Sequence, residues 1–449
     1  MIISQLPELF VQRERALLGP RFDAMFSYPG QGAVRGASVN ALRCTPQQFA
    51  ALADFPLEAS PFCASAFVVP QPDWKPGRHP YHHAGAFYAQ EPSASAPAAL
   101  LDVHPGMRVA DLCAAPGGKS TQSGLRMGGQ GVLVCNEPVW ERAKILSQNI
   151  ERMGIPNALV VSAYPDQLAQ RWPEAFDAIQ VDAPCSGEGM FRRHPETRAE
   201  WSPESPAGCA KRQAEILDRA AEMLRPGGRM VYSTCTMNRT ENEDTVDAFL
   251  LRHADFSLET FSLPGADAPD GMLTCYPHRM KGEGHFVTLL RKHGDAPCNW
   301  QKAPEKDAPN KDALQALRAF CPTANANVMR TGSGKPGRSR DESVMLSCLP
   351  DRPVCDGIQV VRCGLQLGTV QKKLFVPDHA WAMSIFPPDV PRVELTREDA
   401  RRYQAGETLP ADGKGWALAC CDGIPLGWGK ISDGQMKNHY PKGLRRPLR

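Results

Sequence analysis

The chain has 449 residues, of which 42% are hydrophobic and 22% are charged, with a formal net charge of +2. This length suits two or three domains of about 100–200 residues each, and the composition excludes a collagen-like or generally disordered chain. The sequence has no run of about 20 apolar residues, and its first residues lack the regions of a secretory signal. We therefore expect a cytoplasmic protein that does not associate with membranes.

The predicted elements begin with residues 6–18, which have the pattern of a short amphipathic helix. Residues 35–43 are typical of a strand or strand-turn, and the proline-rich residues 70–80 of a connecting loop. These elements indicate a small N-terminal appendage, residues 1–75, in front of a larger unit.

From residue 106 onward, short apolar segments alternate with helical patterns. The predicted strands are residues 109–112, 131–135, 158–161, 176–181, 229–232 and 286–290. The predicted helices are residues 140–153, with Ile145, Leu146 and Ile150 on the apolar side, and residues 213–224, closed by Arg225 to Gly228. This alternation predicts an α/β fold with a mostly parallel, doubly wound sheet. Ligands bind such sheets at the carboxyl ends of the strands.

The remainder of the chain is predicted with less regular structure. Residues 292–312 are polar and typical of a linker, and residues 328–342 of a flexible loop. Strand-like pieces follow at residues 357–361, 365–370 and 415–419. They predict one or two small domains with a strong β component.

A glycine-containing turn follows the first strand of the predicted sheet. Gly117 and Gly118 precede a helix whose free N–H groups can bind an anionic group, and Glu137 ends the next strand nineteen residues later. An acid at an offset of about 20 residues can accept hydrogen bonds from ribose hydroxyls. Neither Gly-x-Gly-x-x-Gly nor a P-loop is present, which disfavours nicotinamide, flavin and ATP. S-adenosylmethionine suits the remaining pattern.

Two cysteines lie at the ends of later strands. Cys185 follows the fourth strand in Asp182-Ala-Pro-Cys-Ser-Gly, and Cys235 follows the fifth in Ser233-Thr-Cys-Thr. The 15 cysteines include no Cys-x-x-Cys pair, so we expect neither a disulfide framework nor a bound metal. Most should be buried structural residues, but the position of these two at strand ends favours chemistry. A free thiol has a pKa of ~8.5, so a reactive one needs a site that favours the thiolate.

The segments around these residues resemble the NOL1/NOP2/Sun family of RNA 5-methylcytosine methyltransferases. The matching motifs are DLCAAPGGKSTQ (residues 111–122), VDAPCSGEGMFRR (181–193) and VYSTCTMNRTENED (231–244). Residues 88–93 and 278–287 resemble its flanking segments, so the likeness spans roughly residues 30–292. It implies a Rossmann-like class I methyltransferase fold and S-adenosylmethionine as cofactor.

The resemblance also implies roles for single residues. Cys235 matches the nucleophile that adds to carbon 6 of cytosine, and Cys185 the second cysteine, which helps to resolve the adduct. Asp182 matches the acid that holds cytosine beside the cofactor, and Lys119 is expected to supply positive charge. The implied cofactor-binding residues are Cys113, Ala114, Ala115, Pro116, Gly117, Gly118, Lys119, Glu137 and Asp182.

One position departs from the family pattern. Many members carry an aspartate after the third strand to meet the adenine, whereas this chain has Ser162-Ala163-Tyr164. The contact then comes from the backbone or from Asp166.

Residues 186–193 and 426–446 resemble the RsmF type, which acts on small-subunit ribosomal RNA and carries a PUA-like C-terminal region. This implies methylation of carbon 5 of cytosine in 16S ribosomal RNA by a monomer, with ribosomal RNA or the small subunit as partner. The expected domains are an RNA-binding appendage (1–75), an S-adenosylmethionine-dependent methyltransferase domain (76–292), a linker and middle α/β region (293–380) and a PUA-like RNA-binding region (381–449).

The basic residues of the tail become candidates for RNA contact under this interpretation. They are Lys437, Lys442, Arg445, Arg446 and Arg449. Trp428 and Tyr440 lie among them and could stack on unpaired bases or belong to the core.

Two alternatives stay open. The first is the same reaction on transfer RNA. The catalytic residues do not distinguish a transfer RNA substrate from a ribosomal RNA substrate, because specificity lies in the appended domains. A non-catalytic RNA-binding ribosome-assembly factor would not need Cys185, Cys235, Asp182 and Lys119. A DNA cytosine methyltransferase would carry Pro-Cys-Gln, and an amino-nitrogen methyltransferase would carry [Asp/Asn]-Pro-Pro-[Tyr/Phe]; neither occurs at these loops.

Overall fold

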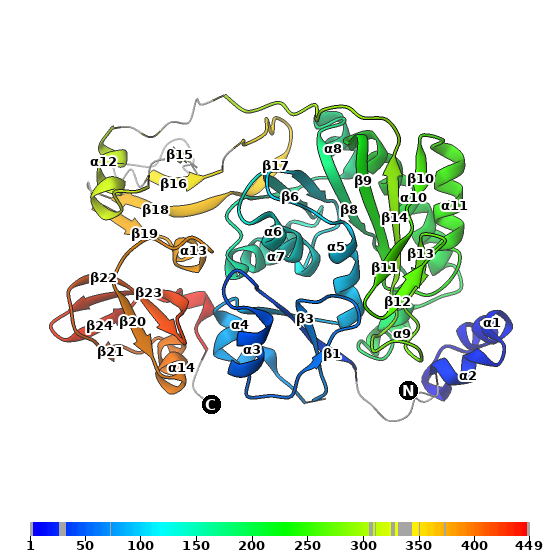
Figure 1. The fold of residues 1–449 in the computed structure, drawn as a ribbon, viewed down its shortest axis with the longest axis horizontal. Coiled ribbons are helices and arrows are strands. Elements are labelled where there is room, and N and C mark those ends of the chain that lie inside the picture. The colour runs from blue at the N-terminus through cyan, green and yellow to red at the C-terminus, as the bar shows by residue number, and fades with distance from the viewer. Residues whose placement is uncertain are drawn as a thin grey trace.

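The computed structural model describes residues 3–26, 33–71, 73–304, 309, 311–324, 328–330, 344–349, 351–371 and 374–446. A nine-stranded sheet lies at its centre, flanked by helices, with smaller units at either end of the chain (Figure 1). No helix in the described ranges is both long and apolar enough to cross a membrane.

The central sheet has the order β10-β14-β9-β8-β5-β6-β7-β17, with β13 paired to β14. Its strands are β5 (Arg108–Asp111), β6 (Val132–Asn136), β7 (Ala158–Ser162), β8 (Phe176–Asp182), β9 (Leu224–Thr234), β10 (Phe256–Leu258), β13 (Met272–Thr274), β14 (Phe286–Lys292) and β17 (Gln359–Cys363). Strands β5 to β9 run parallel, whereas β14 and β17 are antiparallel to their neighbours. The prediction of an α/β fold with a mostly parallel sheet is confirmed. The sequence revealed it because strands that are covered on both faces have near-continuous apolar sequences.

Helices cover both faces of this sheet and form a core on each. The helices on one face are α5 (Ala96–Leu100), α6 (Gly118–Met127) and α7 (Trp140–Met153), and those on the other are α8 (Pro165–Arg171), α10 (Ser205–Met223) and α11 (Glu243–Arg252). Helix α7 has the predicted bounds, with Leu146 and Ile150 buried. Ile145, however, is 50% exposed. The prediction for Ile145 was wrong because residues four apart share a helix face, whereas adjacent residues do not.

The segment between α10 and β9 also differs from the prediction. Helix α10 begins at Ser205, eight residues earlier than expected, since Pro206 is compatible with a first helical turn. Strand β9 begins at Leu224, so Arg225 to Gly228 belong to a strand and do not form a turn that closes the helix. Two smaller elements flank this part of the chain. Helix α9 (Glu196–Glu200) precedes α10, and a hairpin of β11 (Phe261–Leu263) and β12 (Ala266–Ala268) follows β10.

The N-terminal region has two helices, α1 (Glu8–Leu18) and α2 (Arg21–Phe26), followed by a four-stranded sheet. The sheet contains β1 (Arg35–Val39), β2 (Glu58–Ala59), β3 (Ala66–Val69) and β4 (Phe87–Gln90), with α3 (Pro46–Leu52) and α4 (Pro80–His83) between its strands. The predicted first helix and first strand are confirmed. Helices α1 and α2 lie near α9 (Figure 1), and their apolar side chains form a cluster with Phe191 and Trp201.

The C-terminal region contains two further sheets, as the predicted β component required. The first has β15 (Val328–Arg330), β16 (Val344–Cys348), β18 (Leu365–Gln371) and β19 (Leu374–Pro377), with α12 (Lys311–Phe320) and α13 (His379–Met383). The second has β20 (Arg392–Leu395), β21 (Leu409–Pro410), β22 (Gly415–Cys421), β23 (Ile424–Ser432) and β24 (Gln435–Asn438), with α14 (Arg397–Ala405).

Two predictions for this region need correction. Residues 357–361 were assigned to a C-terminal domain, but β17 pairs with β7 and forms an edge of the central sheet. The flexible loop predicted at 328–342 begins with strand β15, and residues 331–342 lie outside the described residues. Short 3-10 helices complete the chain: η1 (Ile3–Gln5), η2 (Pro76–Arg78), η3 (Pro92–Ser95), η4 (Glu188–Met190) and η5 (Lys442–Leu444).

The two aromatic residues considered for base stacking are core residues. Trp428 is 1% exposed and donates its Nε1–H to the carbonyl of Asp378 at 2.8 Å, while Tyr440 is 3% exposed. Of the basic tail, Lys437, Lys442 and Arg446 are exposed, Arg445 is half-buried, and Arg449 lies outside the described residues. Neither ring is therefore available at the surface for stacking, whereas Lys437, Lys442 and Arg446 are exposed.

Candidate active site

Cys185 and Cys235 follow β8 and β9, which are neighbours in the central sheet. Their Sγ atoms are 3.0 Å apart, and the backbone N–H of Cys235 points to the Sγ of Cys185 at 3.3 Å. Both residues are half-buried. Because parallel strands end at the same edge of a sheet, two motifs 50 residues apart meet at one point, as their positions in the sequence predict.

The surroundings of Cys185 favour its protonated thiol over the thiolate. Its hydrogen bond with Cys235, burial, and the charges of Cys235 and Glu241 raise the pKa of Cys185 well above its ordinary value. A protonated Cys185 can donate its S–H towards the Sγ of Cys235. The site therefore places a thiol with a raised pKa within contact distance of a second sulfur.

Lys119 and Asp182 form an ion pair beside the cysteines. Lys119 Nζ, in the first turn of α6, lies 2.7 Å from Oδ2 of Asp182, and Ser233 Oγ donates to the other carboxylate oxygen at 2.7 Å. Burial lowers the pKa of Lys119, but the charge and hydrogen bond of Asp182, together with the charge of Cys235, leave it raised above its usual value. A positive charge is thus maintained next to the thiols.

The turn from Cys113 to Gly118 connects β5 to α6. Asn149 Nδ2 donates to the carbonyl of Pro116 at 2.9 Å, and Ala114 N donates to the carbonyl of Asn136 at 2.9 Å. Gly117 has a φ of 115°, a conformation that favours glycine. A Cβ on Gly118 would approach the Oε1 of Gln90 to 2.5 Å, so a larger residue there would displace the Gln90 side chain.

Glu137 lies directly after β6 and is 2% exposed. Its Oε1 accepts the N–H of Val139 at 3.0 Å, and its Oε2 is 3.2 Å from Nη1 of Arg142. Arg142 also reaches the carbonyl of Ala115 at 3.4 Å, which places Glu137 alongside the Cys113–Gly118 turn. A carboxylate has about four acceptor positions, so Glu137 retains capacity for two ribose hydroxyls.

The segment after β7 offers Tyr164, which is 69% exposed. Asp166 is exposed and pairs with Arg219 of α10 at 2.5 Å. Its engagement with α10 weakens the interpretation that Asp166 meets the cofactor adenine.

Two buried glutamates that the sequence analysis did not single out connect the cysteine loops. Glu241 accepts hydrogen bonds from the backbone N–H of Ser186 at 3.0 Å, from Gln213 Nε2 at 2.9 Å and from Asn238 Nδ2 at 2.7 Å. Glu188 is the second, and both lie within the cysteine motifs. The only signal in the sequence was their position a few residues after each cysteine, which other acids such as Glu243 and Asp244 share.

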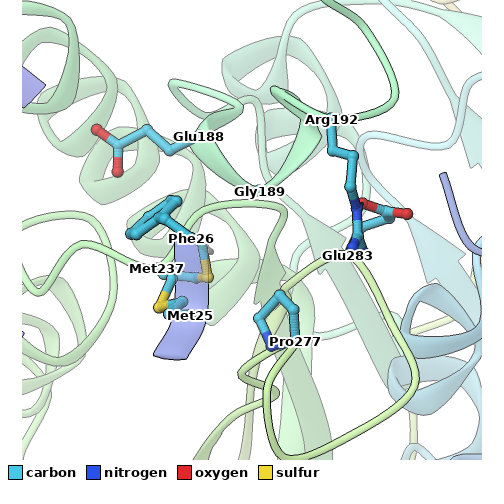
Figure 2. Close-up of a pocket in the computed structure, with 8 residues that line it drawn as sticks. All are labelled: Met25, Phe26, Glu188, Gly189, Arg192, Met237, Pro277 and Glu283. Carbon is cyan, nitrogen blue, oxygen red and sulfur yellow. Dashed lines mark hydrogen bonds and ion pairs between the residues drawn. The ribbon is translucent and has the colours of Figure 1, made fainter. Parts of the chain in front are cut away.

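A pocket lies next to the Cys235 loop, where the N-terminal helices meet the catalytic domain (Figure 2). Its lining residues are Met25, Phe26, Glu188, Gly189, Arg192, Met237, Pro277 and Glu283. Gly189 N donates to the carbonyl of Cys235 at 3.0 Å, so the pocket borders the thiol site. Arg192 turns towards Glu283 and pairs with it at 2.7 Å, on the side away from Phe26.

Asp111, at the end of β5, makes stability depend on pH. Burial raises the pKa of Asp111 to about 7; the hydrogen bond from Ser120 opposes this rise, whereas the charge of Asp182 adds to it. The unfolded carboxyl titrates near ~3.9, so the folded state bears no penalty below that pH. As the pH rises towards about 7, the unfolded state ionises more readily and folding stability is lost.

We therefore expect Asp111→Asn to gain stability relative to wild type as the pH is raised from about 4 to about 8. Urea denaturation of both proteins across this range measures the difference in unfolding free energy. A difference that does not change with pH would contradict the raised pKa.

The chain is similar to known proteins over most of its length. A family model described as "16S rRNA methyltransferase RsmB/F" matches residues 98–291. Models of the RsmF N-terminal domain, first C-terminal domain and PUA domain match residues 6–92, 320–385 and 390–446. The chain is 33% identical to "Ribosomal RNA small subunit methyltransferase F" of Klebsiella pneumoniae (strain 342), covering 98% of this chain and 96% of that protein. The relative of the same name from Aliivibrio fischeri (strain MJ11) is 33% identical, covering 92% and 91%.

Solved structures are similar over the central part of the chain. A methyltransferase homolog protein from Pyrococcus horikoshii matches with a TM-score of 0.57 and 26% identity, covering 65% of this chain and 100% of that one. NSun6 from Pyrococcus horikoshii with SFG has a TM-score of 0.58 at 19% identity, covering 66% and 100%, which supports the fold alone.

Proposed function

Because this chain belongs to the RsmB/F family of 16S rRNA methyltransferases, we propose that it methylates carbon 5 of a cytosine in small-subunit (16S) ribosomal RNA through a covalent cysteine–cytosine adduct. The observation that carries this proposal is the pair of thiols 3.0 Å apart beside the Lys119–Asp182 ion pair. A methyl transfer to nitrogen or to a ribose oxygen needs no thiol, whereas carbon 5 of cytosine is too weak a nucleophile without one.

S-adenosylmethionine is the cofactor and supplies the methyl group. The residues at the ends of β5 and β6 fit such a group. The buried carboxylate of Glu137 suits ribose hydroxyls, and the N-terminal turn of α6 after Gly117 presents backbone N–H groups that suit a carboxylate. We assign Cys113 to Lys119, Glu137 and Asp182 to cofactor binding on this basis.

Cys235 acts as the nucleophile in this proposal. Its thiolate forms a bond to carbon 6 of cytosine, and the electrons of the 5,6 double bond move so that carbon 5 becomes an enamine carbon. Asp182 hydrogen-bonds the ring edge and stabilises the adduct, with Lys119 keeping the local charge positive. Once carbon 5 carries the methyl group, a base takes the proton from carbon 5, the electron pair of that C–H bond re-forms the 5,6 double bond, and the bond from carbon 6 to Sγ breaks so that Cys235 leaves as a thiolate. Cys185, in contact with the same sulfur, assists this release.

The RNA must present an unstacked cytosine, because the thiol has to reach the face of the ring. We propose that the appended regions hold the surrounding RNA. Exposed Lys437, Lys442 and Arg446 of the C-terminal region would neutralise phosphates, which predicts binding that weakens as salt is raised. The domain limits at residues 75, 292 and 380 stay predictions. Strands β1 and β4 lie on either side of residue 75 in the sequence but pair in one sheet.

Bisulfite sequencing of ribosomal and transfer RNA from cells with and without this gene tests the substrate. We expect protection at one or more 16S cytosines to be lost in the deletion strain. A plasmid copy of the wild-type gene should restore it, and a copy carrying Cys235→Ala should not.

The alternatives predict different patterns. Loss of protection only in transfer RNA would keep the mechanism and replace the substrate. Unchanged protection in both RNA classes would contradict the proposed function and favour a non-catalytic assembly factor.

A further inference from the structure

Glu188 connects the N-terminal helix α1 to the loops that carry the thiols. Its carboxylate is 1% exposed and borders the pocket of Figure 2. Oε1 accepts hydrogen bonds from Arg13 Nη2 at 2.6 Å and from Trp201 Nε1 at 2.9 Å. Oε2 accepts from Thr236 Oγ1 at 2.9 Å and from Asn238 Nδ2 at 3.0 Å. One carboxylate therefore holds α1 and the loop that follows Cys235.

The same network continues to the loop of Cys185. Asn238 Nδ2 also donates to Glu241 at 2.7 Å, and Glu241 accepts the N–H of Ser186 at 3.0 Å and bonds its hydroxyl. Ser186 directly follows Cys185. Thus a continuous path of hydrogen bonds leads from Arg13 to the residues adjacent to both cysteines.

Arg13 supplies the positive charge for this network. Its guanidinium is shared between Glu188 and Glu14, the latter at 2.8 Å, and lies 5.4 Å from the ring centre of Trp201. A buried carboxylate that loses its cation must take up a proton or move towards water. Either response removes an acceptor from Thr236 or Asn238, so the Cys235 loop would lose its fixed position.

We propose that Arg13, on a helix outside the methyltransferase sheet, is a positioning residue for the thiol pair. It acts through Glu188, which keeps the Cys185 and Cys235 loops in register. This inference rests on the proposed function in so far as the thiols perform the methyl transfer. It assigns α1 a part in turnover that is separate from any part in RNA binding.

Arg13→Ala is expected to lower kcat by about 10- to 100-fold, because small displacements of reacting groups have effects of this size. The affinities for S-adenosylmethionine and for 16S RNA should stay within about 2-fold, since the guanidinium of Arg13 is engaged by Glu14 and Glu188 and not by the residues assigned to the cofactor. Arg13→Lys should recover part of kcat, because it restores the charge without the forked guanidinium. Arg15→Ala is the matched control: Arg15 lies on the same helix in an exposed pair with Asp23 and should leave kcat unchanged.

The thiol geometry can be measured without RNA. A short bifunctional alkylating reagent links two thiols only when they are close, and mass spectrometry then identifies the peptides joined through Cys185 and Cys235. We expect a yield several-fold lower in Arg13→Ala than in wild type and Arg15→Ala. The double variant Arg13→Ala/Glu188→Gln removes the unpaired buried charge and so guards against simple unfolding. It should have a normal circular dichroism spectrum and show the same loss of kcat as Arg13→Ala.

The outcomes separate the possibilities. Equal kcat and equal cross-linking in the Arg13 and Arg15 variants would overturn the positioning role. A loss of RNA affinity with unchanged kcat and a shallower salt dependence would make Arg13 a phosphate contact instead. If wild type methylates no RNA while cross-linking still depends on Arg13, the proposed function fails and the positioning role stands.

Discussion

Cys235→Ala is expected to reduce methyl transfer by at least ~10³-fold while S-adenosylmethionine still binds, because the methyl acceptor cannot be activated without the attacking thiolate. Cys235 is half-buried, and its replacement removes a single sulfur, so the fold should persist. Transfer of radiolabelled methyl groups to 16S RNA measures the loss, and calorimetric titration measures cofactor binding.

The chain offers a matched control for this variant. Cys298 is also half-buried, but it lies beside Asp177 near the start of β8, away from the carboxyl ends of the strands. Cys298→Ala should retain full activity. Normal activity in Cys235→Ala would remove that residue from the role of nucleophile.

Cys185→Ala is expected to accumulate a covalent protein–RNA complex and to lower turnover by about 10²-fold or more. Cys235 can still attack cytosine in this variant, but the adjacent sulfur that assists release is missing. The complex should appear as a slowly migrating band on a denaturing gel.

The double variant Cys185→Ala/Cys235→Ala provides the control, since it lacks the attacking sulfur and should give no such band. If Cys185→Ala releases RNA as freely as wild type does, the proposed division of roles between the two cysteines is wrong.

The parts of this fold that depend on local sequence were predictable. The buried parallel strands are short apolar runs, and the motifs that follow β5, β8 and β9 mark the edge at which they meet. The proximity of Cys185 and Cys235 follows from the adjacency of β8 and β9, whereas their exact spacing depends on the hydrogen bonds of the loops. The bounds of helix α7 were predicted because its apolar residues repeat at helical spacing. The prediction that Ile145 lies on the apolar side was wrong, since its side chain is exposed.

The parts that depend on distant residues were not predictable. Arg13 and Glu188 are 175 positions apart, and neither sequence context indicates a buried partner. The burial of Trp428 likewise depends on packing against α12 and α13, so a tail rich in cations gave no indication of it. Long-range pairing of this kind needs the assembled fold.

The pairing of β17 with β7 has a consequence for how the protein is made. Strand β7 lies between β6 and β17, so β17 covers one edge of β7. The segment that leads into β17 is also held to the central unit, because the carbonyl of Val354 accepts hydrogen bonds from Arg171 and Trp172. Residues 359–363, which form β17, leave the ribosome after all the other strands of the central sheet have been synthesised. Until then, one side of β7 presents unpaired backbone groups that can associate with other chains. The catalytic unit is therefore finished only late in translation, and the nascent protein depends on its own C-terminal half to close that edge.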